Sequence, residues 1–291
     1  MKRILLFVLT NLAVLALLSI VVFVIESVTG VRLGGPGYGA MLAFAAIFGF
    51  GGALISLAMS KWIAKRTMGV VVIETPSTEA EHWLVATVDR LAAGAQIGRP
   101  EVGVFESEEM NAFATGARRD AALVAVSTGL LRGMSRPQIE AVLGHEISHV
   151  ANGDMVTLTL LQGVLNTFVI FLSRLIGNFV DRALLRNERD GAGLGYFVTT
   201  MVAQVVLGIF ASLIVAAFSR YREFRADRGG ARLAGREQMI GALEALKRSH
   251  GEPMPNQLQA FGINSGPPGA LAGLFQSHPP LDARIAALRA G

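Results

Sequence analysis

The chain has 291 residues, of which 52% are hydrophobic and only 16% are charged, and its formal net charge is +4. Together with a mean hydropathy of +0.49, this composition is too apolar for an ordinary soluble domain and predicts a membrane protein. The chain has no cysteine, which excludes disulfides and thiolate metal sites. The basic balance fits attraction to anionic lipid, and no aromatic-studded basic patch indicates a nucleic-acid partner.

Four segments are long and apolar enough to span a bilayer as helices. They run over residues 4–25, 40–60, 155–172 and 196–218. The first is too long for the apolar region of a signal peptide and has no clear cleavage site, so we expect an uncleaved anchor. Polar residues interrupt the third and fourth segments, which leaves open that these two are buried helices of a large soluble core.

The segment between the second and third apolar stretches has the pattern of a small α+β domain. Runs rich in β-branched residues predict strands at 70–73, 101–105 and 123–127, and amphipathic spacing predicts a helix over 79–93.

The motif His145-Glu146-Ile147-Ser148-His149 follows these strands. A capping box at 135–138 and an apolar stripe at helical spacing place it within a helix. In a helix, His145 and His149 lie one turn apart on one face, so both imidazoles can bind one metal ion. Glu146 then faces the water on that metal and can act as its general base. The motif predicts a zinc peptidase; two solvated histidines on a surface helix are the alternative.

A catalytic zinc needs a third protein ligand, which without cysteine must be His, Asp or Glu. The best candidates are Glu223 and Asp227, which are again one turn apart if this segment is a helix. Glu223 can bind zinc while Asp227 accepts a hydrogen bond from a ligand histidine. Alternatively, both acids pair with the surrounding arginines on a solvated helix.

Two helices are expected at 220–233 and 236–250, and a last helix after Pro280. The intervening loop, 251–276, is rich in glycine and proline. It is either a gate for the site or a plain linker.

Several separated motifs resemble the integral-membrane zinc metalloproteases of the HtpX type, a group that also resembles the CAAX prenyl endopeptidases. Besides H-E-x-x-H, they are R-x-R-E-F-x-A-D at 220–227, Asn111-Ala112-Phe113-Ala114-Thr115-Gly116, and His278-Pro279-Pro280-Leu281-Asp282-Ala283-Arg284-Ile285. The match covers nearly the whole chain. It implies one zinc ion per chain held by His145, His149 and Glu223, with Glu146 as the catalytic base and Asp227 as the partner of a ligand histidine.

The resemblance also implies a substrate site. Asn111 and Ala112 would lie on an edge strand that pairs with extended substrate. His278 would stabilise the oxyanion, and Arg284 would hold a substrate carbonyl. The implied fold is a membrane α+β protein with four transmembrane helices and a mainly helical, gluzincin-like catalytic domain that carries a small β-sheet.

The expected domain organisation alternates between membrane and catalytic parts. Residues 1–62 form a transmembrane hairpin, 63–154 a catalytic part with the H-E-x-x-H helix, 155–218 a second hydrophobic hairpin, and 219–291 a catalytic part with the third ligand. Basic residues before the first span, after the second and after the fourth place both termini and the active site in the cytoplasm. We therefore expect a multi-pass protein of the plasma (inner) membrane.

Three functions are compatible with these features. The favoured one is a membrane-anchored zinc endopeptidase that cleaves misfolded or damaged membrane proteins, a substrate class that rests on the resemblance. An intramembrane zinc protease would carry H-E-x-x-H inside an uninterrupted apolar span, whereas polar residues flank it here. A non-catalytic scaffold or holdase would predict a lost base or ligand, and none is lost. Oligomeric state and cleavage specificity are not encoded in any pattern we find.

Overall fold

The computed structural model describes the residues 38–185, 193–250 and 275–290, together with Ile20, Phe23 and Ser27. The predicted first span and residues 251–274 of the predicted loop lie outside the described residues, apart from those three. The chain divides into two compact units. The helical unit comprises Met1–Ser56 and Leu158–Val215, and the mixed unit comprises Leu57–Thr157 and Ala216–Gly291.

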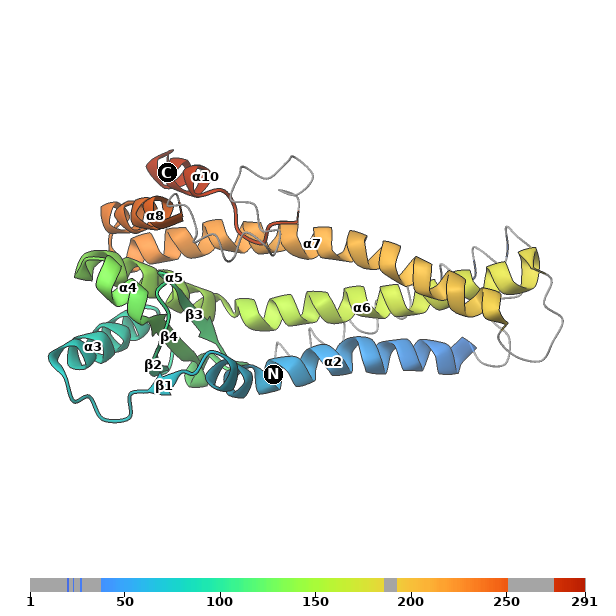
Figure 1. Ribbon diagram of the computed structural model, residues 1–291, viewed down its shortest axis with the longest axis horizontal. Coiled ribbons are helices and arrows are strands. Elements are labelled where there is room, and N and C mark those ends of the chain that lie inside the picture. Colours follow the sequence, from blue (N-terminus) through green and yellow to red (C-terminus); the bar gives the residue numbers. More distant parts are fainter. Residues whose placement is uncertain are drawn as a thin grey trace. The chain divides into compact units, whose positions relative to one another are not determined.

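Three helices of the described chain are long and apolar enough to cross a membrane. They are α2 (Tyr38–Thr67), α6 (Asp154–Phe179), which continues through a π-helical turn (Val180–Leu184), and α7 (Leu194–Ala234) (Figure 1). Each contains one of the three predicted apolar segments that the structure describes.

All three helices are longer than the predicted spans, and α6 and α7 exceed them most. With its π-helical turn, α6 runs over 31 residues, well past the predicted end at 172. Its polar residue Thr167 does not break it, because the hydroxyl donates to the carbonyl of Gly163 one turn earlier. Similarly, the predicted span 196–218 and the predicted helix 220–233 form one continuous helix, α7.

Within the helical unit, glycines let the helices approach closely. A Cβ atom on Gly49 of α2 would lie 2.3 Å from Thr167 Oγ1 of α6, and one on Gly163 would lie 2.5 Å from the Phe50 ring. Between α6 and α7, a Cβ atom on Gly177 would overlap Thr200 Oγ1. Such small-residue contacts are typical of helix packing in membranes, where there is no water to drive association.

The mixed unit contains a four-stranded sheet in the order β1-β2-β4-β3. Its strands are β1 (Val71–Val72), β2 (Glu101–Phe105), β3 (Ala112–Thr115) and β4 (Leu123–Ser127). The predicted strands 101–105 and 123–127 are confirmed. Strand β2 pairs with β4 in parallel, and the other two pairings are antiparallel. No described strand pairs with the outer side of β3, so β3 is an edge of this sheet.

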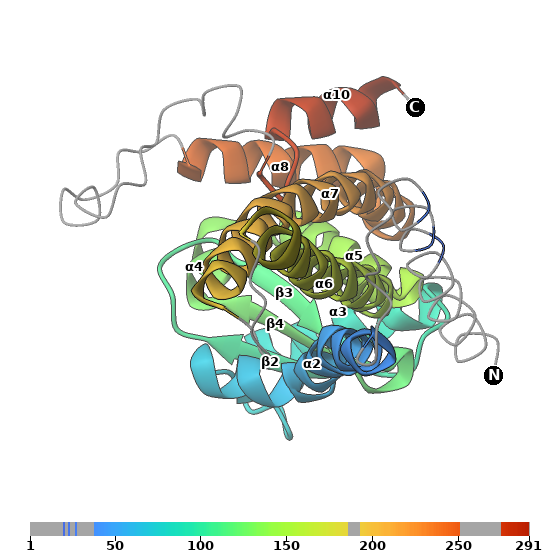
Figure 2. The ribbon, with the colours of Figure 1, turned by 90° about the vertical axis from the view of Figure 1, so that its right-hand side faces the viewer.

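Helices cover the sheet and complete the core of the mixed unit. They are α3 (Glu79–Gly94), α4 (Thr128–Gly133), α5 (Arg136–Asn152), α8 (Arg236–His250) and α10 (Leu281–Ala290), with a short 3-10 turn at Arg119–Ala121. Helix α5 contacts β3, β4, α3 and α8, and α10 packs on α8. Figure 2 shows α10, α8, α5 and the sheet in succession. Buried Val126, Leu143, Ile147, Leu243 and Ile285 belong to the apolar cluster between these layers, which holds α5 rigid.

Candidate metal centre

Helix α5 begins and ends where its sequence requires. Gln138 Oε1 accepts a hydrogen bond of 2.9 Å from the backbone N–H of Ser135, as in the predicted capping box. The helix ends at Gly153, whose φ of +69° is the left-handed conformation that glycine adopts without strain. His145, Glu146 and His149 therefore lie within one continuous helix, as predicted.

Glycines bring α5 into backbone contact with α7. A Cβ atom on Gly144 would lie 3.3 Å from the Cα atom of Gly230, and one on Gly229 would lie 2.3 Å from Ser148 Oγ. Larger residues at these positions would push the two helices apart. The close approach lets the short side chain of Glu223 on α7 reach both histidines of α5.

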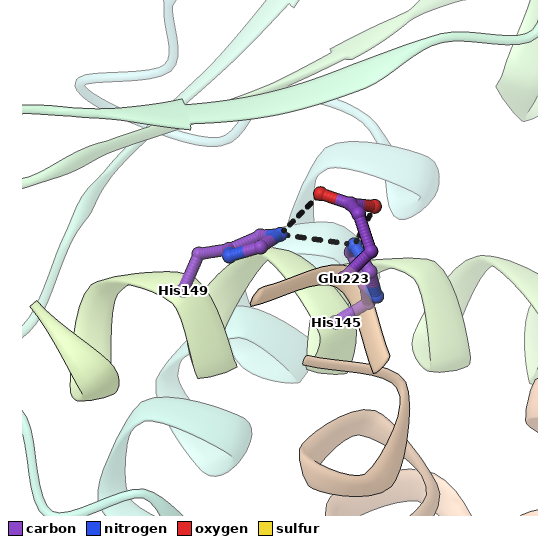
Figure 3. A group of neighbouring side chains, drawn as sticks. All are labelled: His145, His149 and Glu223. Atoms are coloured by element: carbon purple, nitrogen blue, oxygen red, sulfur yellow. Dashed lines mark hydrogen bonds and ion pairs between the residues drawn. The ribbon is translucent and has the colours of Figure 1, made fainter. Parts of the chain in front are cut away.

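The three predicted ligands form one buried group (Figure 3). The Nε2 atoms of His145 and His149 are 3.1 Å apart. Glu223 Oε1 lies 3.3 Å from His149 Nε2, and Glu223 Oε2 lies 3.5 Å from His145 Nε2. The ligand atoms are all within 4.8 Å of one another.

The hydrogen bonds around this group leave its donor atoms available to a cation. His145 Nδ1 is 2.9 Å from Asp227 Oδ1, and His149 Nδ1 is 2.7 Å from Asp154 Oδ2. A carboxylate can only accept, so each Nδ1 carries the hydrogen and each Nε2 presents its lone pair. Glu223 Oε2 is buried without a well-formed hydrogen bond from any described residue.

This donor set fits one zinc ion. Two imidazole nitrogens and one carboxylate are the protein ligands of a tetrahedral catalytic zinc with its fourth position open. Two nitrogens on such an ion are roughly 3.3–3.4 Å apart, close to the 3.1 Å between the two Nε2 atoms here. Two Nε2 atoms this close in a buried site need a metal ion or a proton between them, because their lone pairs repel each other.

The metal-free group binds protons strongly. Burial lowers the pKa of His149, but its hydrogen bonds with Asp154 and Glu223 outweigh burial and raise the pKa to about 9. Burial also opposes the charge of His145, and the bonds with Asp227 and Glu223 again leave its pKa raised. Zinc therefore has to displace a proton from this pair when it binds.

Glu146 lies between the two ligand histidines on α5, and its charge contributes to raising the pKa of both. Every residue from Ala141 to Val150 is described, and all are buried except Glu146, which is partly exposed. Its partial exposure distinguishes Glu146 from the buried residues on either side of it.

His278 and Arg284 also lie at the group. His278 is largely exposed, and its Nδ1 is 2.9 Å from Glu223 Oε2. Arg284 is buried and donates through Nε and Nη2 to the two oxygens of Asp227, at 2.8 and 2.6 Å. Its Nη1 is 3.5 Å from Glu223 Oε2. The structure thus brings both residues to the predicted ligands, and it shows Arg284 holding Asp227.

Asn111 and Ala112 mark the start of the edge strand. Asn111 exchanges hydrogen bonds with Ser127, because its carbonyl accepts from the Ser127 N–H and its N–H donates to Ser127 Oγ. Along an antiparallel strand, the backbone N–H and carbonyl groups of successive residues point alternately toward the partner strand and away from it. The N–H and carbonyl of Ala112 are therefore directed to the open side of β3.

One residue of the site was not predicted from the sequence. Asp154 is fully buried and contacts His149. The sequence held one signal for this contact. Gly153 can end a helix in the left-handed conformation, and the turn that follows can direct the Asp154 side chain back toward His149.

The fold and the buried His-His-Glu group define a zinc metallopeptidase. The model for peptidase family M48 matches residues 78–291. The chain is 60% identical over 297 residues to "Protease HtpX" of Alkalilimnicola ehrlichii, which covers 100% of this chain and 98% of the relative. It is 58% identical over 290 residues to "Protease HtpX homolog" of Thiobacillus denitrificans, and this match covers 100% of this chain and 99% of the relative. The chain therefore belongs to peptidase family M48, as an HtpX-type membrane protease.

A solved structure shares the fold. The match to the crystal structure of S. mikatae Ste24p covers 94% of this chain and 67% of the Ste24p chain, with a TM-score of 0.62 and 18% sequence identity. The resemblance stated from the sequence motifs is thus confirmed, as are the zinc metallopeptidase class and the zinc cofactor.

Proposed function

We propose that the protein is a membrane-anchored endopeptidase that cleaves misfolded or damaged membrane proteins at the cytoplasmic face of the plasma (inner) membrane. The observation that carries this proposal is the chain path through the metal-binding group. Helix α6 starts at Asp154, beside His149, and α7 carries Glu223 after its apolar part. The chain leaves the group through one candidate membrane helix and returns through another, so two crossings would keep all ligands on one side.

The proposed domain organisation follows the same path. The hairpins at 1–62 and 155–218 would anchor the protein, with the N-terminal span as a fourth crossing. The parts at 63–154 and 219–291 would together form a gluzincin-like catalytic domain. H-E-x-x-H lies in α5, which is not one of the helices suited to crossing a membrane. This favours a site outside the bilayer over an intramembrane protease. The complete donor set argues against a scaffold without activity.

We assign the hydrolytic step to Glu146. His145, His149 and Glu223 would hold a zinc ion, which would act as a Lewis acid on the substrate carbonyl and lower the pKa of water. Glu146 takes the proton from the attacking water and passes it to the leaving amine. His278, exposed beside Glu223, would donate a hydrogen bond to the oxyanion.

We propose that substrate binds as an added strand on β3. The outward N–H and carbonyl of Ala112 would pair with an extended peptide, and Asn111 would contact its side chains. Arg284 uses Nε and Nη2 for Asp227, and its Nη1, which is 3.5 Å from Glu223 Oε2, would hold a substrate carbonyl. Recognition through the backbone requires an extended chain, which a misfolded protein offers and a folded one does not.

The catalytic assignment is tested with detergent-purified wild type, Glu146→Gln and Glu140→Gln. Glu140 is a matched control because it lies on the same helix and pairs with Arg90 on α3. We expect about one zinc in all three proteins. Cleavage of an unfolded protein should fall by about 10²–10⁴ in Glu146→Gln alone. Wild-type cleavage by Glu146→Gln would overturn the assignment.

The substrate class is tested in liposomes that hold the enzyme together with one membrane protein, either native or as a destabilised variant. We expect cleavage of the destabilised variant and protection of the native form. Equal cleavage of both forms would overturn the quality-control proposal and leave the peptidase assignment intact.

A further inference from the structure

We propose that Asp154 is a positioning residue of the metal centre: it fixes the tautomer and ring orientation of His149, and Arg225 holds it in place for that purpose. Asp154 Oδ2 is 2.7 Å from His149 Nδ1, and the side chain is 0% exposed. The inference rests on the metal-binding part of the proposed function and adds a residue that the H-E-x-x-H and E-x-x-x-D patterns do not contain.

The left-handed turn at Gly153 makes this contact possible. In a continuous helix, the residue five positions after His149 would point about 140° away from it around the helix axis. Here α5 stops at Gly153, whose N–H bonds back to the Val150 carbonyl at 3.0 Å. Asp154 then begins α6 with its carboxylate turned toward His149. The contact is therefore built by the helix junction.

The charge of Asp154 is balanced from α7. Arg225 donates through Nη2 to Asp154 Oδ1, the oxygen that His149 does not use. Arg222 donates through Nη1 to the Asp154 backbone carbonyl at 3.3 Å. A buried carboxylate is stable as an anion only when it is paired in this way. The two arginines fix the direction of Asp154, so that its Oδ2 faces His149 Nδ1.

Each ligand histidine thus has its own carboxylate and arginine. His145 is bonded to Asp227, which Arg284 holds; His149 is bonded to Asp154, which Arg225 holds. Such outer carboxylates orient the ring and make the ligand nitrogen a better donor, and their loss commonly lowers metal affinity 10–100-fold. Asp154 should therefore contribute to zinc affinity through His149, although it is not itself one of the three ligands.

The test compares Asp154→Ala and Asp154→Asn with Asp181→Asn in the full-length protein. Asp181 is a control because its carboxylate is likewise buried, but it accepts from the backbone N–H groups of Gly193 and Tyr196 at the start of α7 and not from a histidine. Zinc affinity is measured by competition with a chromophoric chelator. The absorption spectrum of the Co²⁺-loaded protein reports ligand geometry. Melting of the zinc-free protein reports folding.

We expect zinc affinity to fall about 10–100-fold in Asp154→Ala and at least about threefold in Asp154→Asn. The Co²⁺ spectrum should change in both, and Asp181→Asn should stay within twofold of wild type. If both Asp154 variants keep wild-type affinity and spectrum, Asp154 only begins α6 and the inference is wrong. If Asp154→Ala does not fold, Asp154→Asn and Arg225→Gln are compared with wild type. A fall in zinc affinity of at least about threefold in both supports the inference, and a smaller change in both contradicts it. A wild type without zinc would instead contradict the proposed function.

Discussion

The two units of the chain treat polar and apolar side chains in opposite ways. In the mixed unit, charged residues such as Glu223, Asp227 and Arg284 are buried and paired with one another. In the helical unit, α7 exposes an apolar stripe, with Phe197 at 60% and Met201 at 63% exposed. A soluble unit hides apolar surface, whereas a unit made for lipid displays it. The cluster of mutually paired charges in the mixed unit thus indicates a functional site, because stability alone does not require buried ion pairs.

The largest expected effect comes from removing a ligand. His149→Ala should lose zinc and reduce proteolysis below detection, since a two-ligand site holds the metal poorly. Zinc content and cleavage of an unfolded protein measure both effects. His82→Ala, an exposed histidine on α3, should behave as wild type. If the His149→Ala variant kept its zinc and its activity, His149 would not be a ligand, and the buried charges of the mixed unit would not mark a metal site.

Metal removal should destabilise the mixed unit. Zinc at a free concentration a thousandfold above its Kd stabilises the folded state by about 4 kcal/mol, so a chelator should lower the melting temperature. The effect should disappear in His149→Ala. A chelator effect of equal size in that variant would show that the metal binds elsewhere.

Two glycines of α7 sharpen the comparison within one helix. A Cβ atom at Gly229, in the mixed unit, would lie 2.6 Å from Ser148 Cβ, whereas one at Gly208, in the helical unit, would meet nothing within 4 Å. We expect Gly229→Ala to cost about 1–3 kcal/mol through overpacking and to weaken zinc binding by separating α5 from α7. Gly208→Ala should be neutral or stabilise by up to about 1 kcal/mol through helix propensity. Thermal melting and zinc affinity test both, and equal effects would contradict the close α5–α7 contact.

The smallest expected effect concerns the edge strand. Ala112→Pro removes one outward N–H without breaking a bond to β4, and proline is tolerated at such edges. Losing one hydrogen bond of about 1 kcal/mol should raise KM for an extended peptide about fivefold. Ala112→Val keeps the N–H, so the difference between the two variants isolates the bond. Identical KM values for the two variants would argue against strand addition at β3.

Residue spacing was sufficient to predict much of the site. H-E-x-x-H and the Glu223–Asp227 interval each place two side chains on one helical face, which depends only on helix geometry. Asp154 could not be found in this way because its position relative to His149 depends on the left-handed turn at Gly153. The role of Gly229 was equally hidden, because it depends on which helix packs against α7.

The fold shows the same limit. The strand β4, buried at every position, is evident as a short apolar run. Gln162, Asn166 and Thr167 left open whether the third segment spans a membrane, and its predicted end at 172 fell short of the observed end at Leu184. Thr167 is instead accommodated by a bond to its own helix. Polar residues that bond within a helix do not end it, and hydropathy alone does not distinguish the two cases.

The account is tested most directly by locating the metal with anomalous X-ray diffraction at the zinc edge on crystals of the wild-type protein. We predict one anomalous peak per chain at about 2.0–2.2 Å from Nε2 of His145, Nε2 of His149 and a carboxylate oxygen of Glu223. A peak held by other residues, or zinc-replete crystals with no peak at this group, would contradict the central claim that these three side chains form the catalytic zinc site.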